Sequence, residues 1–415
     1  MRRPVAPAAA PAAVLCQSLP RRFLRLLCLP RRSLTRLCST RLYSTLLGLA
    51  LLAALMPAAP AAAEPVRFSD IPGWAADDHA AALAAFRAGC PAAVGRKRAK
   101  TAIAVDTAAF RRACAAAAAL PASPDAAIAR RFFETAFTPV RVTTDGFLTG
   151  YFEPEVAGSL APGGPYRTPL YRRPSDLVDL KQGTGALAGF SHARRDAAGR
   201  LSAFDDRAAI EAGALSGQGL ELVWLADPVD AFFVHVQGSA RVRLPDGRIL
   251  RVGYDGKTGH PYTAIGRILI DRGEIAREEM TAERLAAWLK AHPDEAGALM
   301  AQNRSFVFFR PLDRPAGEGP VGALGVPLVA GRSLAVDPSV QPYGLPVFVS
   351  AELPIGPGGA LAPFRRLMAA HDTGSAIKGA GRGDIFVGAG DAAGAVAGRL
   401  RHPAEVFVLV PRDGG

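Results

Sequence analysis

The sequence is poor in cysteine, methionine and tryptophan, and it lacks the signatures of several common enzyme classes. Its 415 residues include 5 Cys, 5 Met and 3 Trp. It contains no H-E-x-x-H pair, no G-x-S-x-G nucleophile elbow and no complete phosphate-binding or dinucleotide-binding glycine motif. These absences argue against a zinc peptidase of that type, an α/β-hydrolase and a nucleotide-dependent enzyme, and we expect neither a metal nor a cofactor.

Positive charge is concentrated at the amino terminus. Residues 1–63 hold nine Arg and no acidic residue, so the net charge of +12 falls to +3 for the rest of the chain. A nucleic-acid-binding domain would need a basic face with interleaved aromatic residues, and residues 64–415 show no such pattern. We therefore expect no nucleic acid among the partners.

Residues 1–63 have the pattern of an export signal. After Arg41 comes an apolar run, TLLGLALLAALM, which is shorter than the about 20 residues that a membrane-spanning helix needs. The following PAAPAAAEP offers a cleavage site after Ala63. No Cys follows the apolar run where a lipoprotein would carry its lipid, so we expect a soluble exported protein, with a membrane anchor as the alternative.

Two cysteines, Cys90 and Cys114, remain beyond this leader. An even pair in an oxidising compartment favours a disulfide, and two free buried thiols are the alternative. Metal binding is a weaker alternative, because neither Cys has a nearby His or a C-x-x-C partner. A disulfide here would stabilise the fold and take no part in the chemistry.

The character of the chain changes near Val140. Before it, three Ala-rich segments have helical periodicity and begin near an Asp or Ser cap: DDHAAALAAFRAGC, DTAAFRRACAAAAAL and SPDAAIARRFFETAF. After it, short β-branched and aromatic runs separated by Gly and Pro predict strands, with a hairpin turn at Pro245-Asp246-Gly247 and a structural His235 on one strand. MTAERLAAWLKAHPDEAGALMAQN predicts a helical interlude. The sequence thus predicts a mainly β protein with N-terminal helices.

Acidic residues in Gly-rich segments are the remaining candidates for chemistry. Residues 371–390, HDTGSAIKGAGRGDIFVGAG, contain Asp372 and Asp384, and AVDPSVQPYG contains Asp337. Asp-Thr-Gly is also the motif of pepsin-like proteases. However, a single-chain aspartic protease needs two such motifs, because two carboxylates share one proton, and this chain has one. The protease interpretation is therefore disfavoured.

Several motifs together resemble the membrane-bound lytic murein transglycosylase A family. The segments AVDPSVQPYGLPVFV and RLMAAHDTGSAIKGAGRGDIFVGAG are similar to the three-aspartate barrel domain of that family. GFLTGYFEPEV, VHVQGSARVRLPDG, RVGYDGKTGHPYTAIGRILIDRGEI and NRSFVFFR are also similar to it and follow its order. The resemblance covers roughly residues 140–410.

This resemblance implies a double-psi β-barrel domain, an inserted second β domain and a substrate groove between them. On that basis we expect four parts. They are a leader over residues 1–63, helices and the first part of the barrel over 64–153, the inserted domain over 154–302, and the second part of the barrel over 303–415.

The resemblance also implies an activity, that of a peptidoglycan lytic exotransglycosylase in cell-wall turnover. Such enzymes cleave the β-1,4 bond between N-acetylmuramic acid and N-acetylglucosamine and leave 1,6-anhydromuramic acid ends. Asp384 matches the single catalytic acid of the family, and Asp372 and Asp337 match its two supporting aspartates. One acid suffices because the 6-hydroxyl of the sugar replaces water as the nucleophile, so that Asp384 acts as general acid and then as base.

Further residues match positions that line the family's groove: Tyr151, Glu153, Gln237, Gly238, Ser239 and Lys378. Taken on its residue type alone, Tyr151 is equally a core aromatic, and Asp337 equally shapes a turn before a proline. An acid catalyst needs a raised pKa, which Asp372 would favour and Lys378 would oppose if either were close to Asp384.

The alternative function is a non-catalytic peptidoglycan-binding module of the same fold. The presence of both Asp372 and Asp384 favours the enzyme. The resemblance further implies glycan strands as the substrate and a periplasmic location, with proteins of cell-wall synthesis or hydrolysis as candidate partners and the outer membrane as a candidate point of association. We expect a monomer.

Overall fold

The computed structural model describes residues 64–97, 100–181, 183–315 and 317–413. The predicted leader, residues 1–63, lies outside this part of the chain. Among the described residues, no helix combines the length and the apolar character needed to cross a bilayer.

Three helices form the first part of the described chain: α2 (His79–Gly95), α3 (Thr107–Ala119) and α4 (Ala126–Ala136). An aspartate precedes each helix, at positions 78, 106 and 125, and accepts a hydrogen bond from the backbone N–H three residues later. Such N-caps satisfy backbone donors that the helix itself cannot pair. The three helix predictions are confirmed.

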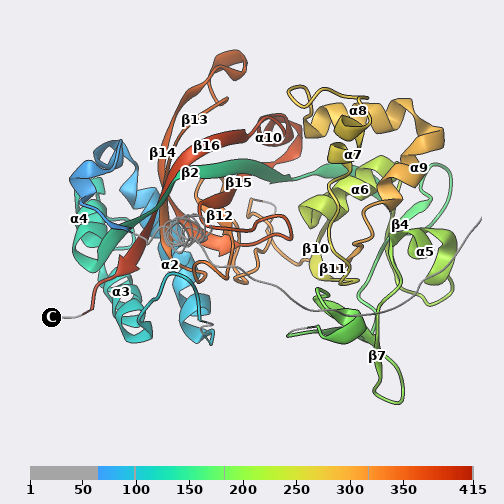
Figure 1. The fold of residues 1–415 in the computed structure, drawn as a ribbon, viewed down its shortest axis with the longest axis horizontal. Coiled ribbons are helices and arrows are strands. Elements are labelled where there is room, and N and C mark those ends of the chain that lie inside the picture. Colours follow the sequence, from blue (N-terminus) through green and yellow to red (C-terminus); the bar gives the residue numbers. More distant parts are fainter. Residues whose placement is uncertain (1–63, 98–99, 182, 316, 414–415) are drawn as a thin grey trace, which may run out of the picture. The chain divides into compact units, whose positions relative to one another are not determined.

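These helices share one hydrophobic core with the barrel. Phe86, Phe110 and Phe133 are fully buried in the same cluster as Phe348 and Phe407 of the barrel strands. In Figure 1 the helices, in blue to cyan-green, lie beside those strands. A disulfide between Cys90 and Cys114, with Cα atoms 5.7 Å apart, joins α2 to α3 within this core.

Six strands of the described chain close a barrel: β2 (Phe137–Glu153), β12 (Ser333–Val336), β13 (Pro346–Leu353), β14 (Ala362–Asp372), β15 (Arg382–Ala389) and β16 (Arg401–Pro411). Their order is β2-β15-β12-β14-β13-β16, and β16 pairs with β2 again. The pairings β2–β15 and β12–β14 are parallel, and the others are antiparallel. Figure 1 shows β2, in green, among the red and orange strands from the end of the chain. This is the double-psi β-barrel of the expected fold class.

Smaller elements complete the barrel. β1 (Glu64–Pro65) pairs with β2, and α10 (Gly390–Ala397) connects β15 to β16. Short 3-10 turns occupy Phe68–Asp70, Trp74–Ala76 and Pro357–Gly359.

The inserted domain begins where β2 ends. In the described chain it has a six-stranded sheet in the order β11-β10-β9-β3-β8-β4. The strands are β3 (Glu155–Ser159), β4 (Thr168–Tyr171), β8 (Glu221–Leu225), β9 (Ser239–Arg243), β10 (Ile249–Lys257) and β11 (Val307–Pro311). A smaller sheet consists of β5 (Leu177–Asp179), β6 (His192–Arg195) and β7 (Leu201–Ser202), with a 3-10 turn at Gly185–Leu187.

Two features of this sheet bear on the predictions. The hairpin at Pro245-Asp246-Gly247 is confirmed, because it joins the antiparallel β9 and β10 and Gly247 has a φ of 83°. β11, in contrast, pairs with β10 rather than with a barrel strand. Residues 303–311 therefore lie with the inserted domain, beyond the boundary expected at residue 302.

The helices of the inserted domain are α5 (Arg207–Ala209), α6 (Pro228–Gln237), α7 (Ile265–Asp271), α8 (Ala282–Ala291) and α9 (Pro293–Ala301), with a π-helical turn at Ile210–Ala214. α8 and α9 confirm the predicted helical interlude. The strand predicted around His235 is wrong, because that residue lies on α6. Asp227 caps this helix, Pro228 occupies its first position and Gly238 ends it at a φ of 79°, and these signals outweigh the strand preference of the aromatic and β-branched residues between them.

Candidate active site

The register of the barrel brings Asp372 and Asp384 to opposite sides of one residue. Ala335 on β12 is the partner of Asp372 on β14 and of Asp384 on β15. Neighbouring strands are about 4.8 Å apart, so the Cα atoms of the two acids are separated by two strand spacings, on the order of 10 Å. Asp337 follows the end of β12. The three predicted aspartates thus come from the same end of three neighbouring strands.

The carboxyl group of Asp384 is held by a threonine from the neighbouring strand. Thr149 and Asp384 are partners in the parallel pairing of β2 with β15, and Thr149 Oγ1 donates to Asp384 Oδ1 over 2.5 Å. The same Oγ1 accepts a hydrogen bond of 2.7 Å from Arg382 Nη2. Since a guanidinium has only donors, the single hydroxyl proton of Thr149 is directed to Asp384.

This arrangement defines where the acidic proton of Asp384 resides. Oδ1 is occupied as an acceptor, so in the protonated state Oδ2 carries the proton. Asp384 is partly exposed, and Oδ2 forms no hydrogen bond with any residue that the structure describes. One oxygen of this carboxyl group is therefore fixed and the other is available to a ligand.

The environment keeps Asp384 protonated at a higher pH than an ordinary aspartate. Burial raises its pKa to about 6. The hydrogen bond from Thr149 and the positive charge of Arg382 oppose this rise, and the negative charge of Asp372 adds to it. Arg382, rather than Lys378, is therefore the cation that opposes the rise in the pKa of Asp384. The side chain of Lys378 is 64% exposed, and its Nζ lies 3.9 Å from Asp337 Oδ1.

Asp372 lies in a well-ordered set of hydrogen bonds. Its Oδ2 accepts from the Tyr151 hydroxyl over 2.8 Å and its Oδ1 accepts from the Ala323 backbone N–H over 2.8 Å. Burial raises the pKa of Asp372 although both bonds favour the carboxylate, and burial together with Asp372 and Asp384 raises the pKa of Tyr151 well above its usual value. Tyr151 therefore remains a neutral phenol that donates to Asp372, and its ring packs on Phe386 with centroids 5.4 Å apart.

Asp337 is bound to the loop between the two other acids. Its Oδ1 accepts from the backbone N–H and the hydroxyl of Ser339, over 3.0 and 2.7 Å, and its Oδ2 accepts from the Gly379 N–H over 2.8 Å. Burial alone would raise the pKa of Asp337, but these bonds and Lys378 hold it below its usual value. Gly379 has a φ of 100°, a conformation that favours glycine. Asp337 thus fixes the loop that leads from Asp372 to Asp384.

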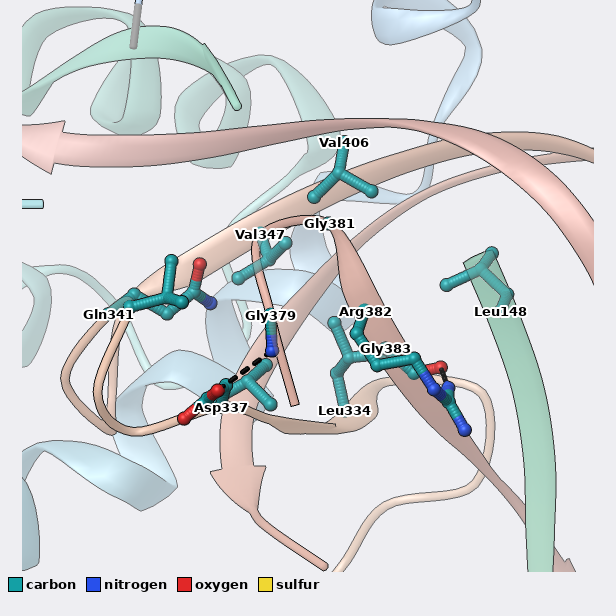
Figure 2. A pocket seen from close by; sticks show the side chains of 12 residues that line it. Leu148, Leu334, Asp337, Gln341, Val347, Gly379, Gly381, Arg382, Gly383 and Val406 are labelled. Carbon is teal, nitrogen blue, oxygen red and sulfur yellow. Dashed lines mark hydrogen bonds between the residues drawn. The ribbon is translucent and has the colours of Figure 1, made fainter. Parts of the chain in front are cut away.

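A small cavity lies behind this loop. Figure 2 shows Asp337 bound to Gly379, with Leu334, Val347 and Arg382 nearby. Its volume of about 10 Å³ is enough for one water molecule and too small for a sugar ring. Asp384 does not line this cavity, so a ligand of Asp384 would not lie in it.

Glu153, which the resemblance matched to the groove, lies in a buried ion-pair network. Its side chain is fully buried, and its carboxylate pairs with Arg251 over 3.0 Å and with Arg241 over 2.9 Å. Glu153 is the last residue of β2, where Pro154 accepts a hydrogen bond from the Arg241 backbone and the second sheet begins. A carboxylate enclosed in this way connects the two domains and is not exposed to a glycan.

The predicted Gln237-Gly238-Ser239 segment forms the turn between α6 and β9. Gln237 Oε1 accepts a hydrogen bond of 3.1 Å from the backbone N–H of Phe152, next to Tyr151. Gly238 ends the helix, and Ser239 is buried at 7% exposure. Of this segment, Gln237 is the residue connected to the strand that carries Tyr151.

Thr149 and Arg382 are the functional residues that the sequence interpretation missed. Side chains alternate along a strand, so Thr149 shares a face with Tyr151, and Arg382 shares a face with Asp384. This two-residue alternation along each strand was the sequence signal that could have identified Thr149 and Arg382. No cluster of three or more His, Cys, Asp or Glu suited to a metal ion occurs among the residues that the structure describes.

A contact beside the acids connects the barrel with the inserted domain. Lys257, at the end of β10, donates to Ser375 Oγ over 2.7 Å, and Ser375 lies three residues after Asp372. Arg401 of β16 donates to the backbone oxygens of Arg277 and Met280 over 2.9 and 2.7 Å. The loops of the inserted domain thus lie close to the end of the barrel that carries the three aspartates.

Comparison with known proteins gives two family matches. Residues 147–310 match the MltA specific insert domain, and residues 332–410 match the 3D domain. The boundaries at residues 310 and 332 agree with the sheet topology, in which β11 ends the inserted domain at Pro311 and β12 begins at Ser333, whereas the first match begins at residue 147, inside barrel strand β2.

Named relatives agree with these matches. The membrane-bound lytic murein transglycosylase A of Escherichia coli K12 is 36% identical over 270 residues, which are 64% of this chain and 66% of the relative, just under two thirds of its length. The structure of a membrane-bound lytic murein transglycosylase from Agrobacterium tumefaciens is 40% identical with a TM-score of 0.78, covering 84% of this chain and 97% of that one. E. coli MltA with bound chitohexaose is 31% identical with a TM-score of 0.54, covering 70% and 80%.

Proposed function

This chain belongs to the membrane-bound lytic murein transglycosylase A (MltA) family, and from this premise we propose that it is a lytic transglycosylase that cleaves the glycan strands of peptidoglycan. The bond is the β-1,4 link between N-acetylmuramic acid and N-acetylglucosamine, and the product carries a 1,6-anhydromuramic acid end. The bound chitohexaose of the E. coli relative, a β-1,4-linked sugar oligomer, supports a glycan substrate.

The observation that carries the proposal is the state of Asp384. A general acid at near-neutral pH needs a raised pKa and a free oxygen, and Asp384 has a pKa of about 6 and an unoccupied Oδ2. Asp384 would protonate the glycosidic oxygen as the bond from the anomeric carbon breaks. The sugar's 6-hydroxyl would then bond to that carbon and return its proton to Asp384.

A single carboxyl group suffices for this reaction, because the nucleophile belongs to the substrate. A hydrolase uses two carboxyl groups, one to protonate the leaving oxygen and one to engage water or the anomeric carbon. In the lytic reaction the 6-hydroxyl is already beside that carbon, which lowers the entropic barrier, and no water is consumed. Thr149 would hold Asp384 in place, Asp372 would help to raise its pKa, and Tyr151 would hold Asp372 in place.

We further propose that the glycan lies between the barrel and the inserted domain, near the contacts of Lys257 with Ser375 and of Phe152 with Gln237. Lys378 is exposed on the loop beside them and is available to the substrate. A periplasmic location follows from the same function, since peptidoglycan is the substrate.

Mass spectrometry of murein digests would test this function. We expect products lighter by one water than hydrolysed muropeptides with the wild-type protein and none with Asp384→Asn. Products at the hydrolysed mass would indicate a water nucleophile and contradict the lytic mechanism. Binding of murein without any product from the wild type would favour the non-catalytic module instead.

A further inference from the structure

The inserted domain contains a large open cavity away from the three aspartates. Its volume is about 790 Å³, within the range of roughly 300–1,000 Å³ that is typical of small-ligand sites. All of its lining residues lie between Arg167 and Phe306, and none belongs to the barrel. The cavity is formed by β4, β8 and α6, together with α8, α9 and the turn after α5. The mechanism described above uses none of these residues.

The interior of the cavity combines aromatic surface with hydrogen-bond donors. Tyr171, Phe232 and Phe306 line it, together with Arg207 and His235. Both Arg207 and His235 are buried residues, 1% and 6% exposed. Arg207 donates to the backbone oxygens of Asn303 and Ser305 and pairs with Glu211 over 3.1 Å. These bonds hold a cation at the cavity wall.

His235 offers a donor that no residue of the described chain accepts. Its Nδ1 accepts a hydrogen bond of 3.1 Å from the Val307 backbone N–H, so the proton of the neutral ring is on Nε2. Burial, and then the charge of Arg207, lower the pKa of His235 well below its usual value, so the ring stays neutral. His235 lines the cavity, and a ligand oxygen there would accept a hydrogen bond from this N–H.

The rim carries charges of both signs. Lys290 pairs with Asp227 over 2.8 Å, whereas Glu221 has no ion pair among the residues described, and Arg167 binds only the Gly164 backbone oxygen there. Trp224 lies between them on β8, partly exposed. A carboxylate and a guanidinium that form no ion pair among the described residues therefore line the same cavity.

We propose that this cavity binds the short peptides that branch from the muramic acid of peptidoglycan. This proposal rests on the proposed function. A ligand that pairs with Arg167 and Glu221 would carry a carboxylate and an amine, and a hydrogen-bond acceptor would suit Nε2 of His235. The side peptides have all three, because they include a dicarboxylic and a diamino acid. The glycan backbone is uncharged and would leave Glu221 and Arg167 without partners.

Helix α6 connects the cavity with β2, the strand whose Thr149 and Tyr151 donate hydrogen bonds to Asp384 and Asp372. It lines the cavity from Pro228 to His235 and ends at Gln237, which binds Phe152 next to Tyr151. A peptide in the cavity would therefore contact an element whose far end touches β2. Occupancy would help to hold a peptide-bearing strand while the glycan lies at Asp384.

Helix α9 provides a matched pair of variants for the test. Gly297 lines the cavity and lies within helix α9 without a positive φ, and a Cβ added there would meet nothing within 4 Å. Gly297→Trp should therefore place an indole ring in part of the cavity without disturbing the helix backbone. Ala298 is exposed and does not line the cavity, so Ala298→Trp adds the same bulk outside it.

Calorimetric titration with the free tripeptide side branch, and separately with chitohexaose, would measure both ligands. We expect the tripeptide to bind the wild type, Asp384→Asn and Ala298→Trp alike, and to bind Gly297→Trp at least roughly tenfold more weakly, while chitohexaose binding stays unchanged. Absence of tripeptide binding, or equal binding to Gly297→Trp, would overturn the proposal. Loss of chitohexaose binding in Gly297→Trp would also overturn it, in favour of a second glycan site.

The two proposals fail separately in this design. Tripeptide binding that responds to Gly297→Trp, in a protein that does not cleave murein, would leave the cavity assignment standing and refute the proposed activity. Cleavage of murein without tripeptide binding would refute the cavity assignment alone.

Discussion

Thr149 Oγ1 lies 2.5 Å from Asp384 Oδ1 and donates its proton to it, while the same oxygen accepts from Arg382. The hydroxyl of Thr149 therefore links Arg382 to Asp384 through two hydrogen bonds. It favours the carboxylate form of Asp384 and so moderates a pKa that burial alone would raise further. In an enzyme whose one acid must both give and regain a proton, a pKa near the working pH is an advantage.

The activity of the wild type should fall as the pH rises above about 6. Asp384 must be protonated to act as an acid, and its pKa is about 6. Thr149→Val removes a hydrogen bond that stabilises the carboxylate, so the pKa of Asp384 should rise and the alkaline limb of kcat/KM should move to higher pH. The measurement is the initial rate of murein cleavage across a pH series.

Thr138→Val serves as the control for this prediction. Thr138 lies on the same strand, where it pairs with Val410 far from the acids. An unchanged alkaline limb in Thr149→Val would mean that the limb belongs to a group other than Asp384.

Asp372→Asn should shift the same limb in the opposite direction. The negative charge of Asp372 contributes to the raised pKa of Asp384, and asparagine removes that charge. The pKa of Asp384 should fall, and activity at neutral pH should decrease by about tenfold or more. The pH profile distinguishes this electrostatic effect from a structural role, because a purely structural role would lower the rate without moving the limb.

The position of the acids was largely predictable, and their partners were not. Asp372 and Asp384 occur in one recognisable segment, and the family resemblance specified the barrel around them. Thr149 and Arg382 become relevant only through the parallel pairing of β2 with β15, which joins residues 235 positions apart. A sequence contains the alternation of side chains along each strand but not which strands lie side by side.

Glu153 and His235 have surroundings that the sequence interpretation did not specify, and the strand predicted around His235 is wrong. Glu153 shares a strand face with Tyr151, but the arginines that enclose it come from β9 and β10 in the other domain. His235 occurs among aromatic and β-branched residues that favour strands, while the helix signals lie at Asp227, Pro228 and Gly238. For His235, the capping residues outweighed the local preference for a strand. For Glu153, contacts with distant arginines determine the surroundings of the side chain.

Glu153→Gln should destabilise the protein without a specific effect on glycan binding. The substitution leaves Arg251, which is 4% exposed, buried without its counter-charge, a loss of about 3–5 kcal/mol. Urea unfolding should show the loss, while KM of the remaining folded protein should change little. Glu155→Gln is the control: Glu155 pairs with the exposed Arg243, and such pairs contribute about 0–1 kcal/mol. A stable Glu153→Gln variant with a raised KM would restore the predicted substrate contact.

Loss of the Cys90–Cys114 disulfide should lower stability and leave catalysis intact. The bridge closes a loop with a sequence separation of 24, for which chain entropy gives about 3 kcal/mol. The double variant Cys90→Ala with Cys114→Ala should therefore unfold at a lower temperature in calorimetry, and its rate per folded molecule should equal that of the wild type. A reduced rate at a temperature where the variant is fully folded would show that α2 and α3 influence the site.

Asp337→Asn should weaken the loop between Asp372 and Asp384, and the effect should depend on pH. Asp337 accepts three hydrogen bonds through its two carboxylate oxygens. In asparagine one of these oxygens becomes an NH2 group, which cannot accept, so we expect the free energy of unfolding to fall by about 1–3 kcal/mol at neutral pH. Because the folded-state pKa of Asp337 is lowered, its contribution is fully present above the unfolded pKa of about 3.9 and is lost as the pH falls through the folded pKa. The difference in unfolding free energy between wild type and Asp337→Asn should therefore be largest near neutral pH and shrink in acid.

Denaturant titrations at neutral and at acidic pH would measure this difference, with Asp391→Asn as a control at an exposed position of α10. A difference that does not change with pH would mean that the lost contacts do not depend on the charge of Asp337. A rate that falls along with stability would show that the loop it holds positions Asp384.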